Sequence, residues 1–173
     1  STVTQAAPIP QDFRFSNATN NTLTTAWSST VPEGRYNVEL SSHSNFSAMV
    51  QSSNTTNTTV SFASLLVNTT YYSHVNSVIN GSTGSWSTNI TTATLANAPA
   101  THTSTWSLVG ITSITVQWMQ NGNPDNVTSY RVELSTVNGF GRRRSSPDLR
   151  MSTAPGNPTG DLRSAPLRTF ILF

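Results

Sequence analysis

The sequence predicts an all-β protein in which two sheets pack face to face as a sandwich, and three observations carry this prediction. Within the first 96 residues, short stretches alternate apolar with polar side chains and are separated by turn residues about every 8 to 12 positions. One stretch, Leu65 to Val75, has the pattern of a strand that is entered through a sharp corner. The pattern of the first half then returns about 91 residues later, which is close to the length of one sandwich module.

The expected strands each have one apolar face. Residues 1–7 form a polar lead-in, after which Pro8 and Pro10 favour the beginning of an edge strand. The strands that follow are rich in Val, Ile, Thr and aromatic residues, which fit a pleated sheet better than a helix. We place them at residues 13–15, 23–27, 36–40, 46–51, 58–62, 71–79 and 86–95, with a hairpin turn at 80–85.

The corner lies in the sequence LLVNTTYYSHV, residues 65–75. Side chains of a strand alternate between its two faces, so Tyr71, Ser73 and Val75 share one face. Leu65 lies six residues before Tyr71, where the chain turns into the strand. A tyrosine at this place buries its ring while its hydroxyl bonds to the backbone a few residues upstream, an arrangement known as a tyrosine corner.

We expect the two sheets to enclose an aromatic-rich core about 10 Å thick. The predicted core residues come from four of the strands and from the corner: Trp27, Tyr36, Leu40, Phe62, Leu65, Tyr71 and Val75. The chain contains no Cys, so neither a disulfide nor a thiolate metal site holds this core together.

An internal repeat covers the first half of the module twice. Its matched pairs are Pro8 and Pro99, Phe15 and Trp106, Leu23 and Ile114, and Trp27 and Trp118 at an offset of 91, then Tyr36 and Tyr130, Leu40 and Leu134, and Phe46 and Phe140 at an offset of 94. The additional residues fall in NGNPDNVTS, between two strands, where a loop accommodates insertions at low cost. The repeat predicts a complete module at 8–96 and the first three strands of a second at 99–140.

This set of residues resembles a fibronectin type III domain, which is an immunoglobulin-like sandwich. The residues that carry the resemblance are Pro8, Trp27, Tyr36, Val38, Leu40, Leu65, Thr69, Tyr71, Trp86 and Ser87. Val67 stands where the family usually has Pro and Ser73 where it usually has Val, so we expect a less rigid corner and a thinner core. The repeats are similar to tandem modules of large bacterial surface and secreted proteins. The family implies a spacer or binding module, and seldom an enzyme.

Residues 141–173 break the repeat and are expected to form an irregular or disordered tail that contains Arg and Pro. They lack period-two alternation and a second tyrosine corner. Three strands alone expose one core face and bury too little surface to offset the entropy of ordering. Three explanations stay open: a chance sequence from an altered reading frame or a truncated gene, a disordered basic tail, or a half-sandwich that a strand from another chain completes.

The charge of the chain is low and unevenly placed. Charged residues make up 9%, against about 25% in an average domain, and Ser, Thr and Asn fill the polar positions. Six of the nine Arg follow position 141, and the first 140 residues are slightly acidic, which argues against a nucleic-acid partner. No apolar run reaches the ~18 residues of a membrane span. We expect an extracellular protein, secreted or on the cell surface, and interpret the start at Ser1 as that of a mature form or a fragment.

No group of residues predicts catalysis, metal binding or cofactor binding. His43, His74 and His102 lack partners at ligand spacing and are expected on the solvated surface. Glu39 and Glu133 occupy the same repeat position in separate modules, so they do not flank one glycosidic bond. Nucleophile-elbow, P-loop and dinucleotide-binding motifs are absent from the sequence.

Nine Asn-x-Ser/Thr sequons match the acceptor sequence for N-linked glycans. They begin at Asn17, Asn20, Asn45, Asn54, Asn57, Asn68, Asn80, Asn89 and Asn126. Because the chain has 17 Asn and is rich in Ser and Thr, about five sequons are expected by chance, and we interpret them as a consequence of composition. The RRRSS run at 142–146 resembles a kinase recognition site or a phosphate-binding patch and is interpreted as incidental.

Tyr72 and Trp86 are the candidate ligand platform, an aromatic surface for a sugar or a peptide. The alternative for Trp86 is a strand-edge residue that covers the rim of the core.

The sequence predicts two alternative functions. The first is a non-catalytic extracellular spacer or adhesion module of a larger surface or secreted protein, whose partners include neighbouring modules of the same chain. The second is a carbohydrate- or protein-binding accessory module of a secreted enzyme. Such a binding module is expected to present two or three aromatic rings in a line on one sheet face.

Overall fold

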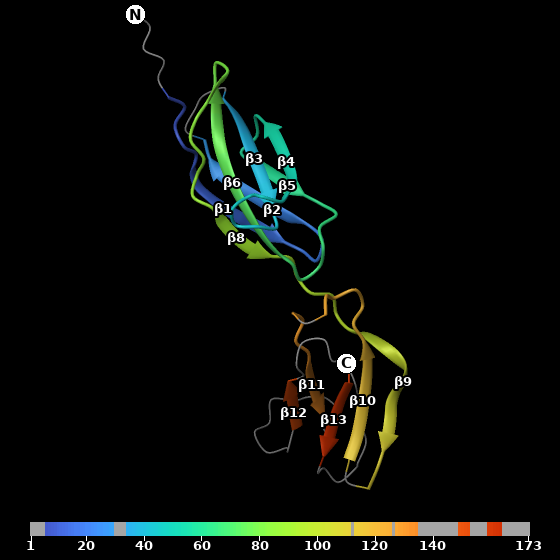
Figure 1. Ribbon diagram of the computed structural model, residues 1–173. Helices are drawn as coiled ribbons and strands as arrows, with labels where there is room; N and C mark the ends of the chain where they lie inside the picture. The colour runs from blue at the N-terminus through green and yellow to red at the C-terminus, as the bar shows by residue number, and fades with distance from the viewer. Residues whose placement is uncertain are drawn as a thin grey trace, which may run out of the picture. The chain divides into compact units, whose positions relative to one another are not determined.

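A computed structural model describes residues 6–29, 34–111, 113–125, 127–134, 149–152 and 159–163. The chain divides into two compact units, residues 1–96 and 97–173, which Figure 1 shows. Each element in the described ranges is a β-strand, and the strand pairs are antiparallel. The predicted all-β class is therefore confirmed.

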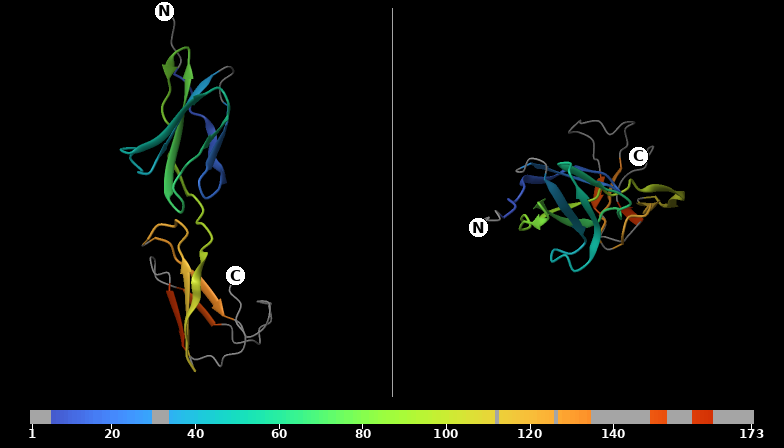
Figure 2. Two further views of the ribbon diagram at one scale, coloured as in Figure 1. Left: turned by 90° about the vertical axis from the view of Figure 1, so that its right-hand side faces the viewer. Right: turned by 90° about the horizontal axis from the view of Figure 1, so that it is seen from above.

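The first unit is a sandwich of two sheets. Its strands are β1 (Gln11–Ala18), β2 (Leu23–Ser28), β3 (Arg35–Ser41), β4 (Met49–Thr55), β5 (Thr59–Phe62), β6 (Thr70–Ile79), β7 (Ser82–Thr83) and β8 (Ile90–Ala93). One sheet has the order β1-β2-β5, and the other has the order β4-β3-β6, with β7 and β8 both paired to β6. Figure 1 and Figure 2 show β6 (green) running along the length of the unit. Because side chains alternate along a strand, β6 presents one set to the core and the other to the opposite surface of its sheet.

Two strands begin later than the alternation of side chains predicts. β4 begins at Met49 rather than at Phe46, because Phe46 has a φ of 56°, a left-handed conformation found in turns and not in strands. β8 is shortened at its start because a side chain interrupts the ladder: Val75 N donates to Ser87 Oγ at 3.1 Å in place of a backbone carbonyl. The hairpin expected at 80–85 is present as the turn between β6 and β7.

One aromatic-rich cluster fills the space between the sheets. Its buried members are Leu23, Trp27, Tyr36, Val38, Leu40, Phe62, Leu65, Tyr71 and Val75, which include all seven residues expected from the sequence. Trp27 on β2 and Tyr36 on β3 meet edge to face with ring centroids 5.3 Å apart, so this pair joins one sheet to the other. An aromatic pair of this kind adds about 0.5–1.5 kcal/mol to the free energy gained from area burial.

The corner before β6 is closed by hydrogen bonds to both sides of its backbone. The Tyr71 hydroxyl accepts a hydrogen bond from Leu66 N at 3.0 Å. Thr94 Oγ1 donates to Leu66 O at 2.6 Å and accepts a hydrogen bond from Thr69 N at 3.0 Å. The expected tyrosine corner is therefore present, and these bonds hold it although Val67 stands in the position of the family's usual proline.

Ser73 occupies a core-facing position of β6 without leaving its hydroxyl unpaired. The residue is fully buried, and its Oγ donates to the backbone carbonyl of Glu39 on β3 at 2.7 Å. A buried hydroxyl without such a partner would destabilise the fold. The small side chain at this position is therefore compensated by an additional hydrogen bond between β6 and β3.

The N-terminal segment lies against β6. The Ser77 hydroxyl donates to the Pro8 carbonyl, and Ala7 is buried although it belongs to the expected polar lead-in. Ser77 is also bonded through its backbone, since its carbonyl accepts a hydrogen bond from Gly84 N at 2.8 Å. Gly84 permits the close approach, because a Cβ atom there would collide with the Ala7 carbonyl oxygen.

The second unit has five strands in its described parts. They are β9 (Ala100–Val109), β10 (Ser113–Met119), β11 (Arg131–Leu134), β12 (Leu149–Ser152) and β13 (Thr159–Arg163). Its sheets have the orders β13-β10-β9 and β11-β12, which repeat the β5-β2-β1 and β3-β4 arrangements of the first unit. The aromatic contact is repeated as well, since the ring centroids of Trp118 and Tyr130 lie 5.5 Å apart.

Two short strands lie in the segment that we expected to be irregular, residues 141–173. β12 pairs with β11, and β13 pairs with β10. A strand edge pairs through backbone N–H and C=O groups, so alternation of side chains is not required for such pairing. The expectation of an irregular tail is therefore wrong for these two strands, and the rest of the tail lies outside the described residues.

Tyr71→Phe is expected to lower the free energy of unfolding by about 1–2 kcal/mol, because Leu66 N loses its acceptor while the ring stays buried. Urea denaturation followed by tryptophan fluorescence measures the change. Tyr72→Phe is the matched control: the Tyr72 hydroxyl has no hydrogen bond within the described residues, and the expected change is below about 0.5 kcal/mol. Equal losses in the two variants would contradict the role of the corner.

Gly84→Ala is expected to displace the N-terminal segment and to lower the free energy of unfolding by about 1–3 kcal/mol, because the added methyl group meets the Ala7 carbonyl. Amide hydrogen exchange at residue 84, whose N–H donates to Ser77 O, and urea denaturation measure the two effects. Gly81→Asn is the control, since a Cβ atom at Gly81 meets nothing within 4 Å and Asn tolerates a positive φ. Unchanged exchange and stability in Gly84→Ala would rule out the close approach.

Candidate ligand-binding face

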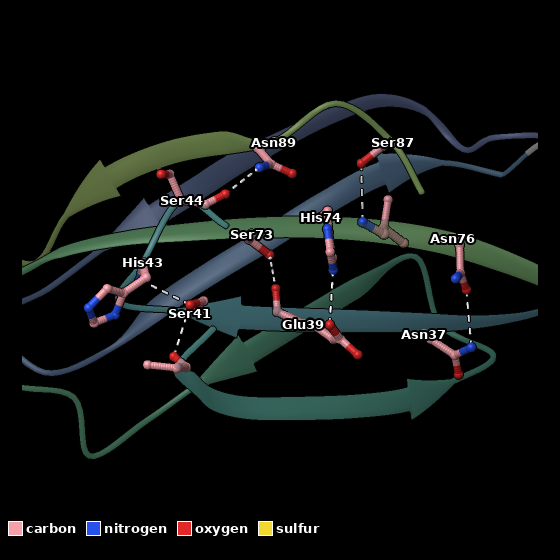
Figure 3. A network of polar contacts seen from close by, with 12 residues as sticks. Asn37, Glu39, Ser41, His43, Ser44, Ser73, His74, Asn76, Ser87 and Asn89 are labelled. Atoms are coloured by element: carbon pink, nitrogen blue, oxygen red, sulfur yellow. Dashed lines mark hydrogen bonds and ion pairs between the residues drawn. The ribbon is translucent and has the colours of Figure 1, made fainter. Parts of the chain in front are cut away.

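The candidate site is the side of the β4-β3-β6 sheet that faces away from the core, here termed the outer face. Asn37 and Glu39 alternate with core residues along β3, and the strand register places them opposite Asn76 and His74 of β6. Asn54 of β4 lies opposite Asn37 on the other side. Figure 3 shows the two β3–β6 side-chain contacts bridging the strands, so the outer face is a network rather than a set of separate side chains.

An amide row crosses three strands at one part of the outer face. Arg35 Nη1 donates to Asn54 Oδ1 at 3.4 Å, and Asn54 Nδ2 donates to Asn37 Oδ1 at 2.7 Å. Asn37 Nδ2 then donates to Asn76 Oδ1 at 3.1 Å. The hydrogen bonds all run in one direction, so the amide dipoles polarise one another. The row therefore gives the buried Asn76 a partner, and its one charged member is Arg35 at the far end.

His74 is buried on the outer face, so the expectation of a solvated histidine at this position is wrong. The residue is 8% exposed, and its Nε2–H donates to Glu39 Oε2 at 2.9 Å. Strand alternation correctly placed it on the side away from the core, but two aromatic side chains cover that side here. His43 is exposed as expected, and His102 is half-buried, with its Nδ1 accepting a hydrogen bond from Ser104 N at 3.1 Å.

Three rings stack on the outer face with the imidazole of His74 in the middle. The rings of Phe46 and His74 have centroids 3.7 Å apart and an interplanar angle of 3°. The rings of Trp86 and His74 have centroids 3.8 Å apart and an interplanar angle of 17°. Two nearly parallel rings at these distances must lie on opposite sides of the imidazole. We term Phe46, His74 and Trp86 the aromatic stack; Glu39 orients it through the central ring.

The aromatic stack joins two loops that are distant in the sequence. Phe46 belongs to the turn between β3 and β4, and Trp86 to the segment between β7 and β8. Asn89 Nδ2 donates to Ser44 O at 2.9 Å, which ties the same two loops together directly (Figure 3). Ser87 N donates to a carbonyl of β6 at 2.8 Å and anchors the second loop to the sheet. The exposed rim of the stack is therefore held in place before any ligand arrives.

The two residues of the predicted ligand platform lie in different surroundings. Trp86 is 37% exposed, and its ring is one end of the aromatic stack. Tyr72 is half-buried on β6, opposite Ser41 of β3, and has no ring contact within the described residues. The fold thus brings Trp86 together with Phe46 and His74 rather than with Tyr72.

The outer face offers aromatic rings and mostly neutral hydrogen-bonding groups, together with two charged side chains, Glu39 and Arg35. Among the described residues, no three His, Asp or Glu side chains are grouped as metal ligands would be. Within the described residues, the imidazole of His74 has one hydrogen-bond partner, Glu39. A Ser-His-Asp triad also needs a nucleophilic hydroxyl bonded to the other ring nitrogen, and none is bonded there within the described residues. Glu133, the counterpart of Glu39 in the repeat, lies in β11, and its side chain is outside the described part.

The sequons lie on the surface of the first unit. Seven of the eight described acceptor Asn residues are exposed, and Asn68 is half-buried. Asn126 and the RRRSS run at 142–146 lie outside the described residues. Exposure is needed for glycosylation but is also usual for Asn in turns, so the interpretation of the sequons as a consequence of composition stays a prediction.

Phe46, His74 and Asn89 are the members of the site that sequence reasoning missed. A signal for the Glu39–His74 contact exists in the sequence, because β3 and β6 are strongly alternating strands and opposite residues on one face come within reach. No comparable signal exists for Phe46 or Asn89, since each reaches the site from a turn or an interrupted strand.

Comparison with known proteins agrees with this fold. Residues 8–93 match the family model for the fibronectin type III domain. Among solved structures, a two-domain fibronectin type III segment of chicken tenascin is similar, with a TM-score of 0.58 and 18% identity over 91% of this chain and 84% of that chain. At that identity the likeness shows the fold alone.

Single domains also match over about half of this chain. They include a human fibronectin type III domain (TM-score 0.46, 13% identity, 55% of this chain and 92% of that chain) and the FN5 domain of Drosophila Lar (TM-score 0.43, 15% identity, 53% of this chain and 100% of that chain). A search of curated proteins found no match.

His74→Ala is expected to lower the free energy of unfolding by about 1–3 kcal/mol, because two ring contacts of about 0.5–1.5 kcal/mol each are lost. Urea denaturation measures the loss, and the Trp86 indole resonance reports the change in its surroundings. The matched control is His43→Ala, which removes an exposed imidazole and is expected to change stability by less than about 0.5 kcal/mol. The same small change in both variants would mean that the stack does not stabilise the fold.

Proposed function

Residues 8–93 are a fibronectin type III domain, and from that premise we propose that this chain is a non-catalytic, extracellular spacer and adhesion module of a larger surface or secreted protein. Domains of this family are commonly spacers or binding modules within larger proteins. The observation that carries the proposal is that residues of the first unit alone fill and cover its hydrophobic core. A module whose stability comes from its own packing can separate or connect other parts of a protein without needing a ligand.

The closure of the core has two parts. The Trp27–Tyr36 contact joins the two sheets, and the bonds to Leu66 from Tyr71 and Thr94 close the corner through which β6 enters. Both are made within the first unit, residues 1–96, by residues at positions 27 to 94. A sandwich built in this way folds as one cooperative element, which is what resistance to extension requires.

The repeat supports a tandem arrangement. The second unit has the same strand order in its described sheets and the same Trp–Tyr contact as the first. Serial copies of one module lengthen a protein without a new fold, as the resemblance to tandem modules of large bacterial surface proteins suggests. Neighbouring modules are accordingly the first partners that we propose.

The extracellular assignment rests on composition. The polar residues of the chain are mainly Ser, Thr and Asn, and charged residues make up only 9%. No helix in the described ranges is long and apolar enough to pass through a membrane. The second candidate function is an accessory module that binds carbohydrate or protein for a secreted enzyme. The exposed Trp86 favours it, but Phe46 and His74 are stacked against Trp86 and are half-buried and buried, so they do not form the expected line of two or three exposed rings.

Single-molecule pulling on the full chain between two handles tests the spacer role. The first unit is expected to unfold in one step with a contour-length gain on the order of 30 nm, at ~3.3–3.6 Å per residue of the domain. A chelator is expected to leave the force unchanged. Trp27→Ala is expected to lower the unfolding force, because it removes about 3–5 kcal/mol from the core. Extension without a discrete step would contradict the proposal.

A further inference from the structure

We propose that the aromatic stack of Phe46, His74 and Trp86 is the centre of a binding site for neutral polysaccharide chains. The inference deepens the proposed function and rests on it, because it names what an adhesion module of this kind would hold. Trp86 supplies the stacking surface, and the neutral polar groups of the two loops beside it supply hydrogen bonds. The three steps that follow concern the ring, its rim and the charge of the face.

The ring of Trp86 is both accessible and fixed in orientation. It is 37% exposed, whereas Trp27 and Trp118 are buried in the cores of their units. One side of its indole rests on the imidazole of His74, and Glu39 holds that imidazole through a 2.9 Å hydrogen bond. The face of an indole carries negative potential, which attracts the weakly positive C–H groups that a pyranose ring presents on one side. Because the ring is already ordered, little side-chain entropy is lost when a sugar binds.

The rim of the stack matches the hydroxyl groups of a sugar. Exposed neutral side chains flank the rings on the two loops: Ser42, Ser44 and Asn45 on one, and Ser85, Thr88 and Asn89 on the other. Amides and hydroxyls both donate and accept hydrogen bonds, as sugar hydroxyls do. The 2.9 Å bond from Asn89 Nδ2 to Ser44 O keeps the two loops at a constant separation. The rim is thereby preorganised together with the ring.

The charge of the face selects a neutral ligand. The sequence from Leu40 to Pro124 contains no Asp, Glu, Lys or Arg, and both loops of the rim belong to that stretch. The Glu39 carboxylate on the outer face is engaged by His74. Arg35, the cation of the outer face, belongs to the amide row, where it bonds to Asn54, and the two rim loops contain no Lys or Arg. An acidic polysaccharide or a charged peptide would therefore find no Lys or Arg counterion at the rim. A neutral polysaccharide has no charge that needs a counterion, so the chemistry of the face favours it.

Titration of the isotope-labelled full chain with soluble oligosaccharides tests the site by NMR. Cellohexaose, xylohexaose and maltohexaose are the neutral probes, and a galacturonic acid hexamer is the charged comparator. At least one neutral probe is expected to shift the Trp86 indole N–H and the Asn89 and Ser44 signals saturably, with a Kd of about 1 mM because a single ring contributes most of the contact. Trp86→Ala is expected to weaken binding about tenfold or more, and Trp86→Phe to restore part of it.

Leu66→Ala is the matched control, since Leu66 is 72% exposed and belongs to the corner before β6 rather than to the stack or its two loops, so its loss is expected to leave the Kd unchanged. The proposal is overturned if none of the neutral probes produces saturable shifts up to about 20 mM, if Trp86→Ala binds as well as the original chain, or if the galacturonic acid hexamer alone binds. The pulling experiment separates this failure from failure of the proposed function. A discrete unfolding step without glycan binding contradicts the binding site but agrees with the spacer role, whereas absence of the step contradicts the spacer role as well.

Discussion

The edge-to-face contact between Trp27 and Tyr36 is the interaction on which the rest of the structure depends. It joins the two sheets within the core of the first unit, and the matching pair in the second unit, Trp118 and Tyr130, is also in contact, with a tilted geometry. Protein interiors are packed as densely as organic crystals, so a fixed pair of rings sets the spacing between the sheets and restricts every neighbouring side chain. The repeat therefore keeps the pair that defines the sandwich, while its surface residues differ.

β6 carries this constraint from the core to the surface. Tyr71 and Val75 are buried between the sheets, and the alternation of the strand then requires His74 to emerge on the outer face at one defined place. Glu39 lies opposite it in the register of β3. A site built on paired strands is more precise than one built on loops alone, because the strands are held by their own packing. The aromatic stack obtains its order in this way, although two of its three rings come from loops.

Much of the fold could be predicted from local patterning, and less of the candidate site. The strands and the core follow from alternation, and the corner follows from the spacing of Leu65 and Tyr71. Trp86 could be recognised as an aromatic residue outside the core pattern, but its neighbours could not. Phe46 reaches the stack through a left-handed turn, which leaves no period-two signal. The strands of the tail were missed for a related reason, since backbone pairing places few demands on side chains.

Residue order along the chain was sufficient to specify a β-sandwich, its buried aromatic residues and its partial duplication, because each of these depends on side chains that are near in sequence or regularly spaced. Folding in three dimensions was required to bury His74 on an outward-facing position and to align it with Phe46 and Trp86. These three residues are far apart along the polypeptide and meet only after the sheets have packed and the two loops have been tied by Asn89 and Ser44. Such contacts leave no local pattern in the sequence, because they form only when segments that are separate in the chain come together in the folded protein.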